Sequence, residues 1–251
     1  MNTATKDLLY KMADDAFIIG HRNSEWTGIG PMLEEDLAFS SMAQDKIGHA
    51  WALYKILNEQ FGEADADVLG FQRKANDFKC CQFVELPIGE YDFSLVRHFL
   101  FDHAEYLRYE ALSESSFEPL ALLAKKIKSE IKYHTMHADT LLRQLANGSE
   151  EAKARIQNAL NYSWHFALGI FEESSAENEL ISNKVFIGED ALKSQWIEKV
   201  SSIIDAAGLK VPVTENTKII LGGRKGTHSE YLQPLLTEMT EVLASDPNAE
   251  W

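Results

Sequence analysis

Apolar residues recur every three or four positions along most of this sequence, which is the spacing that gathers them on one face of an α-helix. The pattern predicts helices over 5–26, 33–61, 93–113, 119–147, 150–171 and 190–207. Breaks rich in glycine or proline separate them, and Gly62 and Gly70 bracket one short further piece. The breaks lie at 27–31, 74–91 and 208–226. A last helix is predicted to begin at Thr227, because the Thr-His-Ser-Glu sequence of 227–230 has the form of an N-terminal capping box.

Four of these helices are long and amphipathic, namely those over 5–26, 33–61, 93–113 and 119–147. Such helices bury their apolar stripes by packing together as a four-helix bundle, and shorter helices then add to its outside. We therefore predict an all-α fold, a ferritin-like four-helix bundle with additional helices. It is expected to form a single helical domain over residues 1–251.

The balance of charges narrows the range of partners. The sequence has 39 acidic against 24 basic residues and a formal net charge of −15. A surface this acidic repels nucleic acid and anionic lipid, so we expect neither a nucleic acid nor a membrane as a partner. No stretch approaches the ~20 apolar residues of a membrane span, and residues 1–15 lack the apolar core of a signal peptide. With Cys80 and Cys81 expected as reduced thiols, these features predict a cytoplasmic protein.

Polar and charged residues interrupt the apolar stripes of the predicted bundle. Lys46 and His49 lie in the stripe of its second helix, Asp102 in that of its third and His134 in that of its fourth, and Glu25 lies near the end of its first. A buried charge is costly unless it has a partner. We therefore expect these side chains to meet one another or a metal ion, with the Lys46 ammonium paired with Glu25 or Asp102.

The spacing of these residues points to a metal centre that has been lost. In ferritin-like carboxylate proteins, two helices each give one carboxylate to a di-iron centre and two others each give a Glu-x-x-His pair. Here the residue three before His49 is Lys46, and the residue three before His134 is Ile131. A cation and a hydrocarbon side chain thus stand where glutamates are expected. We predict a vestigial centre at Glu25, Lys46, His49, Asp102, Ile131 and His134, with no metal bound by this chain.

Other interpretations of the same residues stay open. One is a single divalent ion held by Glu25, His49, Asp102 and His134. Another is a different helix phase, in which Glu130 and His134 share a face because they are four residues apart. His103 and His137 are then the neighbouring alternatives to the histidines of the stripe.

A glycine-rich loop carries a second candidate site, at Gly222, Gly223, Arg224 and Lys225. It precedes a predicted helix start, where backbone N–H groups and the helix dipole can bind phosphate. The loop is not a P-loop, because the Gly-x-x-x-x-Gly-Lys-Ser/Thr spacing is absent. It is predicted either to contact the phosphates of a coenzyme A ester at a partner interface, or to be a structural loop or a contact between subunits.

Three segments resemble a known family. Two segments are similar to the PaaC-type structural subunits of 1,2-phenylacetyl-CoA epoxidases. The first comprises residues 22–28 and 33–38. The second is the Gly-Gly-Arg-Lys-Gly-Thr-His-Ser-Glu sequence of 222–230 together with the residues that follow it up to Met239. The Gln-Asp-Lys-Ile-Gly-His of 44–49 resembles the Gln-Asp-Glu-x-Gly-His of the related catalytic subunit, with Lys46 in place of the ligand glutamate. The resemblance extends over nearly the whole chain.

The resemblance implies a structural, non-catalytic subunit of a multicomponent oxygenase for aerobic phenylacetate degradation. It implies a heteromer with a catalytic subunit that carries the di-iron centre, a reductase subunit in the full complex, and an aryl-CoA ester as substrate. Positions that match the catalytic subunit's ligands are Glu25, His49, Asp102 and His134. The alternatives are a free-standing ferritin-like iron oxygenase that uses those four residues, and a ferritin-like module of an unrelated assembly.

Overall fold

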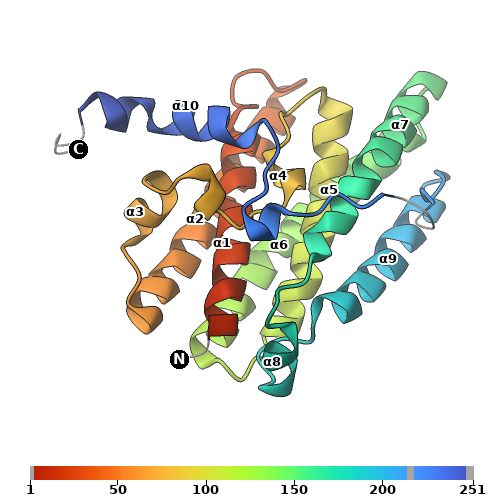
Figure 1. Cartoon of the computed structure of the whole chain (residues 1–251). Coiled ribbons are helices and arrows are strands. Elements are labelled where there is room, and N and C mark those ends of the chain that lie inside the picture. The colour runs from red at the N-terminus through yellow and green to blue at the C-terminus, as the bar shows by residue number, and fades with distance from the viewer. Residues whose placement is uncertain (1–2, 214–217, 247–251) are drawn as a thin grey trace.

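The protein is built from helices, as the computed structural model in Figure 1 shows for residues 3–213 and 218–246. Within those residues, four long helices make the bundle: α1 (Thr3–Ser24), α2 (Leu33–Phe61), α5 (Tyr91–Leu112) and α6 (Glu118–Ala146). Their ends lie within two residues of the predicted ones. The predicted all-α fold, a ferritin-like four-helix bundle with additional helices, is confirmed.

The bundle consists of two helix pairs that face each other. Helix α1 packs along α2, α5 packs along α6, and α2 meets α6 across the core. Leu53 and Leu57 of α2, Phe99 of α5 and Ile127 of α6 are buried in this core. Burying aliphatic and aromatic side chains in this way stabilises the fold by roughly 1.5–3 kcal/mol for each. The polar residues of the stripes are thereby carried into a water-poor interior.

Two further helices cover α5 on one side of the bundle (Figure 1). Helix α7 (Glu150–Ala167) begins as predicted, because the Ser149 side chain accepts a hydrogen bond from the Ala152 N–H at 3.1 Å. It continues into the 3₁₀ helix η2 (Leu168–Phe171), and α9 (Glu189–Ala206) lies beside it. Helices α7 and α9 contact each other through Trp164 and Trp196, whose stacked rings have centroids 5.1 Å apart.

Short helices occupy the stretches between the long ones. They are α3 (Ala66–Phe71), η1 (Ala75–Asp77), α4 (Gln82–Glu85) and α8 (Glu177–Ser182). The region 74–91, predicted to be irregular, therefore contains two short helical turns, η1 and α4, within the described residues. Asp65 caps α3 through a 2.9 Å hydrogen bond from the Val68 N–H to its side chain.

The predicted start of the last helix at Thr227 is wrong. Helix α10 (Leu232–Ser245) begins five residues later, and its N-cap residue, Tyr231, makes no side-chain capping hydrogen bond. Within the predicted first turn, the N–H and hydroxyl of Ser229 both donate instead to the distant carboxylate of Glu85, at 2.7 and 2.6 Å. Helix α10 then extends away from the body of the protein, on the side that also carries α3 (Figure 1).

The described helices include no candidate for crossing a lipid bilayer, since none combines sufficient length with sufficient apolar character.

Candidate functional site in the bundle core

Lys46 is completely buried at the centre of the bundle. Its ammonium contacts two carboxylates of α5, those of Asp102 and Glu105. Burial by itself lowers the pKa of Lys46, but the charges of both carboxylates and their hydrogen bonds outweigh it, so that this pKa is raised. Lys46 therefore carries a positive charge in the core, and α5 supplies the counter-charge.

Asp102 also contacts a histidine of its own helix, His98, one turn earlier. Burial opposes ionisation of Asp102, whereas the neighbouring His98 and Lys46 favour it and hold the pKa of this carboxyl well below its usual range. Burial raises the pKa of Glu105 despite the ammonium beside it. The ionised partner of Lys46 is thus Asp102, with Glu105 the more readily protonated of the two.

Histidine–carboxylate contacts join α2 to α6 along the same core. The pairs are His49 with Glu130 at 2.7 Å, His134 with Asp45 at 3.0 Å and His137 with Glu35 at 3.1 Å. Burial, and then the charge of Lys46, lower the pKa of His49 to about 3. Burial also lowers the pKa values of His134 and His137. These rings are therefore neutral at pH 7, and each donates its Nε2 proton to the carboxylate that faces it.

The structure brings most of the predicted core residues together. The Nδ1 atom of His134 lies 4.0 Å from the Asp102 carboxylate, and the rings of His49 and His134 stack with centroids 6.5 Å apart. Ile131 is fully buried and offers no ligand atom. Of the two proposed partners of Lys46, the structure selects Asp102.

Glu25 does not belong to this cluster. It lies just past the end of α1, where its carboxylate pairs with Arg22 at 2.6 Å, and its side chain is 31% exposed. The expectation that Glu25 contributes to the vestigial centre or pairs with Lys46 is therefore corrected. The physical reason is that α1 ends at Ser24, so the following turn no longer directs position 25 into the bundle.

Several core residues were missed by the sequence argument. Glu105 and His98 escaped notice although they lie three residues after and four residues before Asp102, which places all three on one helix face. That spacing is the signal that could have found them. The carboxylates of Glu35 and Asp45, in contrast, are recognisable only from the long-range contacts that they make with α6.

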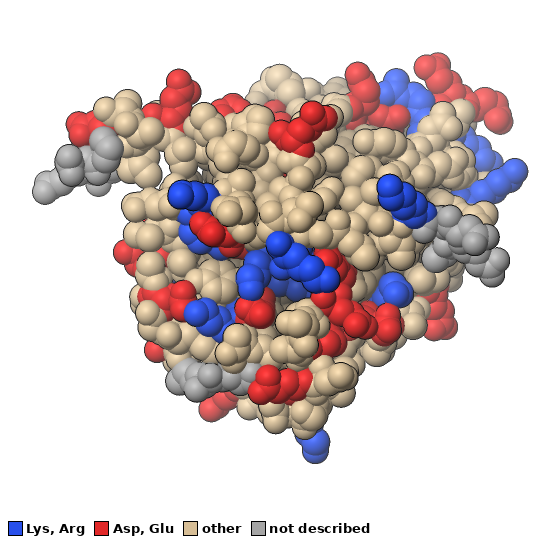
Figure 2. Space-filling view, in the orientation of Figure 1, with Lys and Arg blue, Asp and Glu red and all other residues tan. Residues whose placement is uncertain are grey.

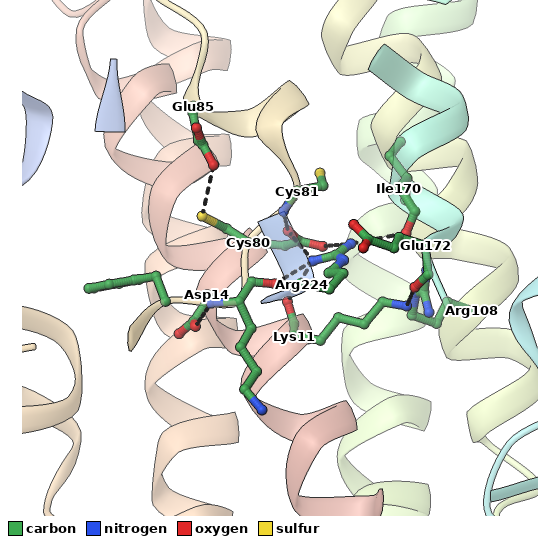
Figure 3. A network of polar contacts seen from close by, with 12 residues as sticks. Lys11, Asp14, Cys80, Cys81, Glu85, Arg108, Ile170, Glu172 and Arg224 are labelled. Atoms are coloured by element: carbon green, nitrogen blue, oxygen red, sulfur yellow. Dashed lines mark hydrogen bonds and ion pairs between the residues drawn. The ribbon is translucent and has the colours of Figure 1, made fainter. Parts of the chain in front are cut away.

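The glycine-rich loop forms the 3₁₀ helix η3 (Gly223–Lys225) and packs into the protein. Arg224, labelled near the centre of Figure 3, is buried, and it binds Asp15 of α1 through two hydrogen bonds of 2.7 Å. It also donates to the backbone carbonyls of Lys79 and Ile170, at 2.8 and 3.0 Å. A Cβ atom at Gly223 would come within 2.2 Å of the Cys80 carbonyl oxygen, which explains the glycine there.

The contacts of this loop do not favour a phosphate site. The Gly222 N–H donates to Glu172 at 2.7 Å, and the exposed Lys225 lies 3.5 Å from the same carboxylate. A hollow of about 190 Å³ beside the loop is lined by acidic as well as basic residues, including Asp7 and Lys79, which pair at 2.6 Å. Figure 2 shows a small basic group near the centre of this face with acidic side chains beside it, not a broad basic surface. The structural-loop alternative therefore fits Arg224 and both glycines.

Comparison with known proteins shows which family the chain belongs to. The sequence model of the family described as "Phenylacetic acid catabolic protein" matches residues 1–251. The chain belongs to this family. It is 30% identical over 251 residues to the C subunit of the 1,2-phenylacetyl-CoA epoxidase of Escherichia coli (strain K12), with 100% of both chains covered. It is 26% identical over 194 residues to the A subunit of the epoxidase from the same organism, with 74% of this chain and 62% of that protein covered.

These comparisons confirm the resemblance found in the sequence motifs. The match to the C subunit runs from end to end, whereas the match to the A subunit covers part of each chain. The bundle core and the glycine-rich loop therefore belong to a chain that is similar to the C subunit over its full length.

Proposed function

We propose that this protein is the structural, non-catalytic subunit of a multicomponent 1,2-phenylacetyl-CoA epoxidase. Its full-length similarity to the C subunit of such an enzyme and its partial similarity to the A subunit support membership of the complex. The observation that carries the non-catalytic role is the buried ammonium of Lys46, held between Asp102 and Glu105 in the bundle core.

The core residues do not fit a di-iron centre. The ammonium of Lys46 takes up the charge of the α5 carboxylates, and it would repel a divalent ion 4 Å away by about 8 kcal/mol at an effective dielectric constant of 20. Ile131 supplies no carboxylate, and Glu25 is paired with Arg22 outside the core. These features support a vestigial centre without a metal on this chain, and they weigh against a free-standing iron oxygenase that uses Glu25, His49, Asp102 and His134.

In this proposal the chemistry belongs to the partners. A catalytic partner similar to the epoxidase A subunit holds the di-iron centre, and a reductase delivers electrons. The present chain binds the catalytic partner, and the two together form a heteromer. A cytoplasmic location is part of the same proposal, and the free thiols of Cys80 and Cys81 agree with it.

The hypothesis of an aryl-CoA contact at the glycine-rich loop now depends on one side chain. Arg224 is committed to Asp15, so Lys225, with 68% of its side chain exposed, is the cation of the loop that can reach a phosphate. We expect Lys225→Ala to leave the Michaelis constant of the assembled enzyme for the aryl-CoA ester unchanged if the loop is structural, and to raise it if the loop binds the ester.

The proposal is tested by co-expressing this chain with its proposed catalytic partner and purifying each alone and both together. We expect a stable complex whose iron follows the partner, and less than stoichiometric iron on this chain alone. Two irons per isolated chain would overturn the non-catalytic role. Failure to co-purify, with both chains folded, would overturn the structural role.

A further inference from the structure

A second group of ligand-type side chains lies outside the bundle core. Within residues 3–213 and 218–246, the thiol of Cys80, a carboxylate oxygen of Glu85 and a ring nitrogen of His228 all lie within 4.8 Å of one another. Cys80 and Glu85 are fully buried, and His228 is partly buried. Figure 3 shows the side chains of Cys80 and Glu85 pointing toward each other. The core site described above uses none of the three.

His228 meets acceptors on both sides of its ring. Its Nε2 atom lies 3.0 Å from the Phe78 carbonyl oxygen, and its Nδ1 atom lies 2.6 Å from Oε1 of Glu85. A carbonyl oxygen can only accept, so the Nε2 atom must carry the proton of the neutral ring. The Nδ1 lone pair then faces a carboxylate, and that contact requires a further proton or a cation between the two atoms.

The second oxygen of Glu85 is also held in place. Oε2 accepts hydrogen bonds from the N–H and the hydroxyl of Ser229, at 2.7 and 2.6 Å, which leaves Oε1 directed at Cys80 and His228. Metal-binding histidines commonly donate their other ring N–H to a carbonyl, and metal-binding carboxylates are commonly fixed by further hydrogen bonds. Both orienting contacts are present here before any ion is added.

The distances suit a tetrahedral ion with a small adjustment. With bonds of about 2.3 Å to sulfur and about 2.0–2.2 Å to nitrogen and oxygen, ligand atoms of a zinc site are about 3.4–3.6 Å apart. The Cys80 sulfur lies 3.6 Å from Oε1 of Glu85 and 3.9 Å from Nδ1 of His228. The 2.6 Å separation of His228 and Glu85 must open by about 0.8 Å.

We propose that Cys80, Glu85 and His228 form a zinc-binding site, with water in the fourth position on the partly exposed side of His228. A thiolate, a carboxylate and a neutral imidazole bring two negative charges, which a zinc ion neutralises in this buried setting. Binding displaces the thiol proton of Cys80 and the proton shared by His228 and Glu85, and both pass to solvent. The mixed sulfur, nitrogen and oxygen donor set favours zinc over magnesium or calcium.

The site would link parts of the chain that are far apart in sequence. Cys80 lies two residues before α4 and Glu85 is the last residue of that helix, whereas His228 belongs to the segment that precedes α10. An ion shared by these residues fastens the base of the projecting helix to the bundle. The proposal concerns this chain alone and does not depend on its membership of an epoxidase.

The test is a titration of the chelator-treated full chain with Co²⁺, followed by displacement with Zn²⁺. We expect one ion per chain, a thiolate-to-cobalt charge-transfer band in the near ultraviolet, and a melting temperature that rises when Zn²⁺ is added. Cys80→Ala should abolish the band. Cys81→Ala is the matched control, since Cys81 is the adjacent buried thiol and lies outside the cluster, and it should keep the band.

The wild-type spectrum decides the question even if Cys80→Ala fails to fold. A wild-type titration without a thiolate band would overturn the site, and so would an equal band in a folded Cys80→Ala variant. Weak binding of several ions without the band would mean adventitious binding by the acidic surface and would also overturn it. Iron analysis of the purified chain before chelator treatment reports separately on the bundle core, so the two proposals can fail independently.

Discussion

The ammonium of Lys46 on α2 and the carboxylate of Asp102 on α5 are in direct contact, and both side chains are completely buried. Two charged groups that are costly to bury alone are thus buried as a pair, and the pair joins the two halves of the bundle.

Removing the cation should unbalance the core. We expect Lys46→Met to lower the free energy of unfolding by about 3–5 kcal/mol, because Asp102 and Glu105 are left buried without their counter-charge. Urea denaturation at pH 7 measures this change. The control is Lys55→Met in the same helix, whose side chain is 51% exposed and which should change stability by less than about 0.5 kcal/mol. Equal effects of the two substitutions would contradict the role given to Lys46.

Restoring both glutamates should restore metal binding. The double variant Lys46→Glu with Ile131→Glu recreates a Glu-x-x-His pair on α2 and on α6, so we expect iron uptake well above that of the wild type and a melting temperature that rises with Fe²⁺. Without metal, this variant should be less stable than the wild type, because like charges crowd around Asp102. Ile131→Glu alone is the control, since it keeps the ammonium; iron uptake by this single variant equal to that of the double variant would refute the argument.

The neutral histidines should make stability depend on pH. The pKa of His49 is about 3 in the folded protein against 6.5 in the unfolded chain. The unfolded state therefore binds more protons at intermediate pH, so the stabilisation is complete above about pH 6.5 and is lost as the pH falls from there toward 3. We expect His49 to contribute a loss of about 1.4 kcal/mol per pH unit in this interval.

Urea denaturation between pH 7 and 5 checks this expectation, because most carboxylates remain ionised in that interval. His49→Gln cannot take up the proton and should give a shallower slope than the wild type. An unchanged slope would show that His49 does not contribute to the acid sensitivity.

Substitutions of the two adjacent basic residues of the glycine-rich loop should have very different effects on stability. Arg224→Ala should destabilise the protein by about 3–5 kcal/mol, since it leaves Asp15 buried without its ion-pair partner. Arg224→Lys should recover only part of this, because an ammonium cannot reproduce the two-pronged contact. Lys225→Ala should fall within about 0.5 kcal/mol of the wild type, since its side chain is exposed. Thermal and urea denaturation of the three variants would reveal any reversal of this order.

The fold could be predicted from the sequence because the signal for long amphipathic helices is local. Helices α2 and α6 are specified by apolar residues a few positions apart, and their predicted ends were correct to within a residue. The start of α10 could not be found in this way. The capping-box pattern at Thr227 is a local signal, but Ser229 within it donates two hydrogen bonds to Glu85, more than a hundred residues earlier, and the helix begins only at Leu232.

The core site was predicted in part, because some of its residues also give a local signal in the sequence. Lys46, His49, Asp102 and His134 stand out because each breaks an apolar stripe. Glu25 was misplaced because its position depends on where α1 ends: the predicted end at 26 is two residues beyond the observed end at Ser24, and the carboxylate pairs with Arg22. Single-sequence periodicity places helix ends only to within a few residues.

The ion pair between Asp15 and Arg224 spans 209 residues of sequence. During translation, the carboxylate of Asp15 is made early, yet its cation, Arg224, is added only 209 residues later. Until then α1 carries an uncompensated acid on a surface destined for the interior, so its final docking waits for the last part of the nascent polypeptide. Premature termination before position 224 would release a product in which Asp15 has lost its ion-pair partner.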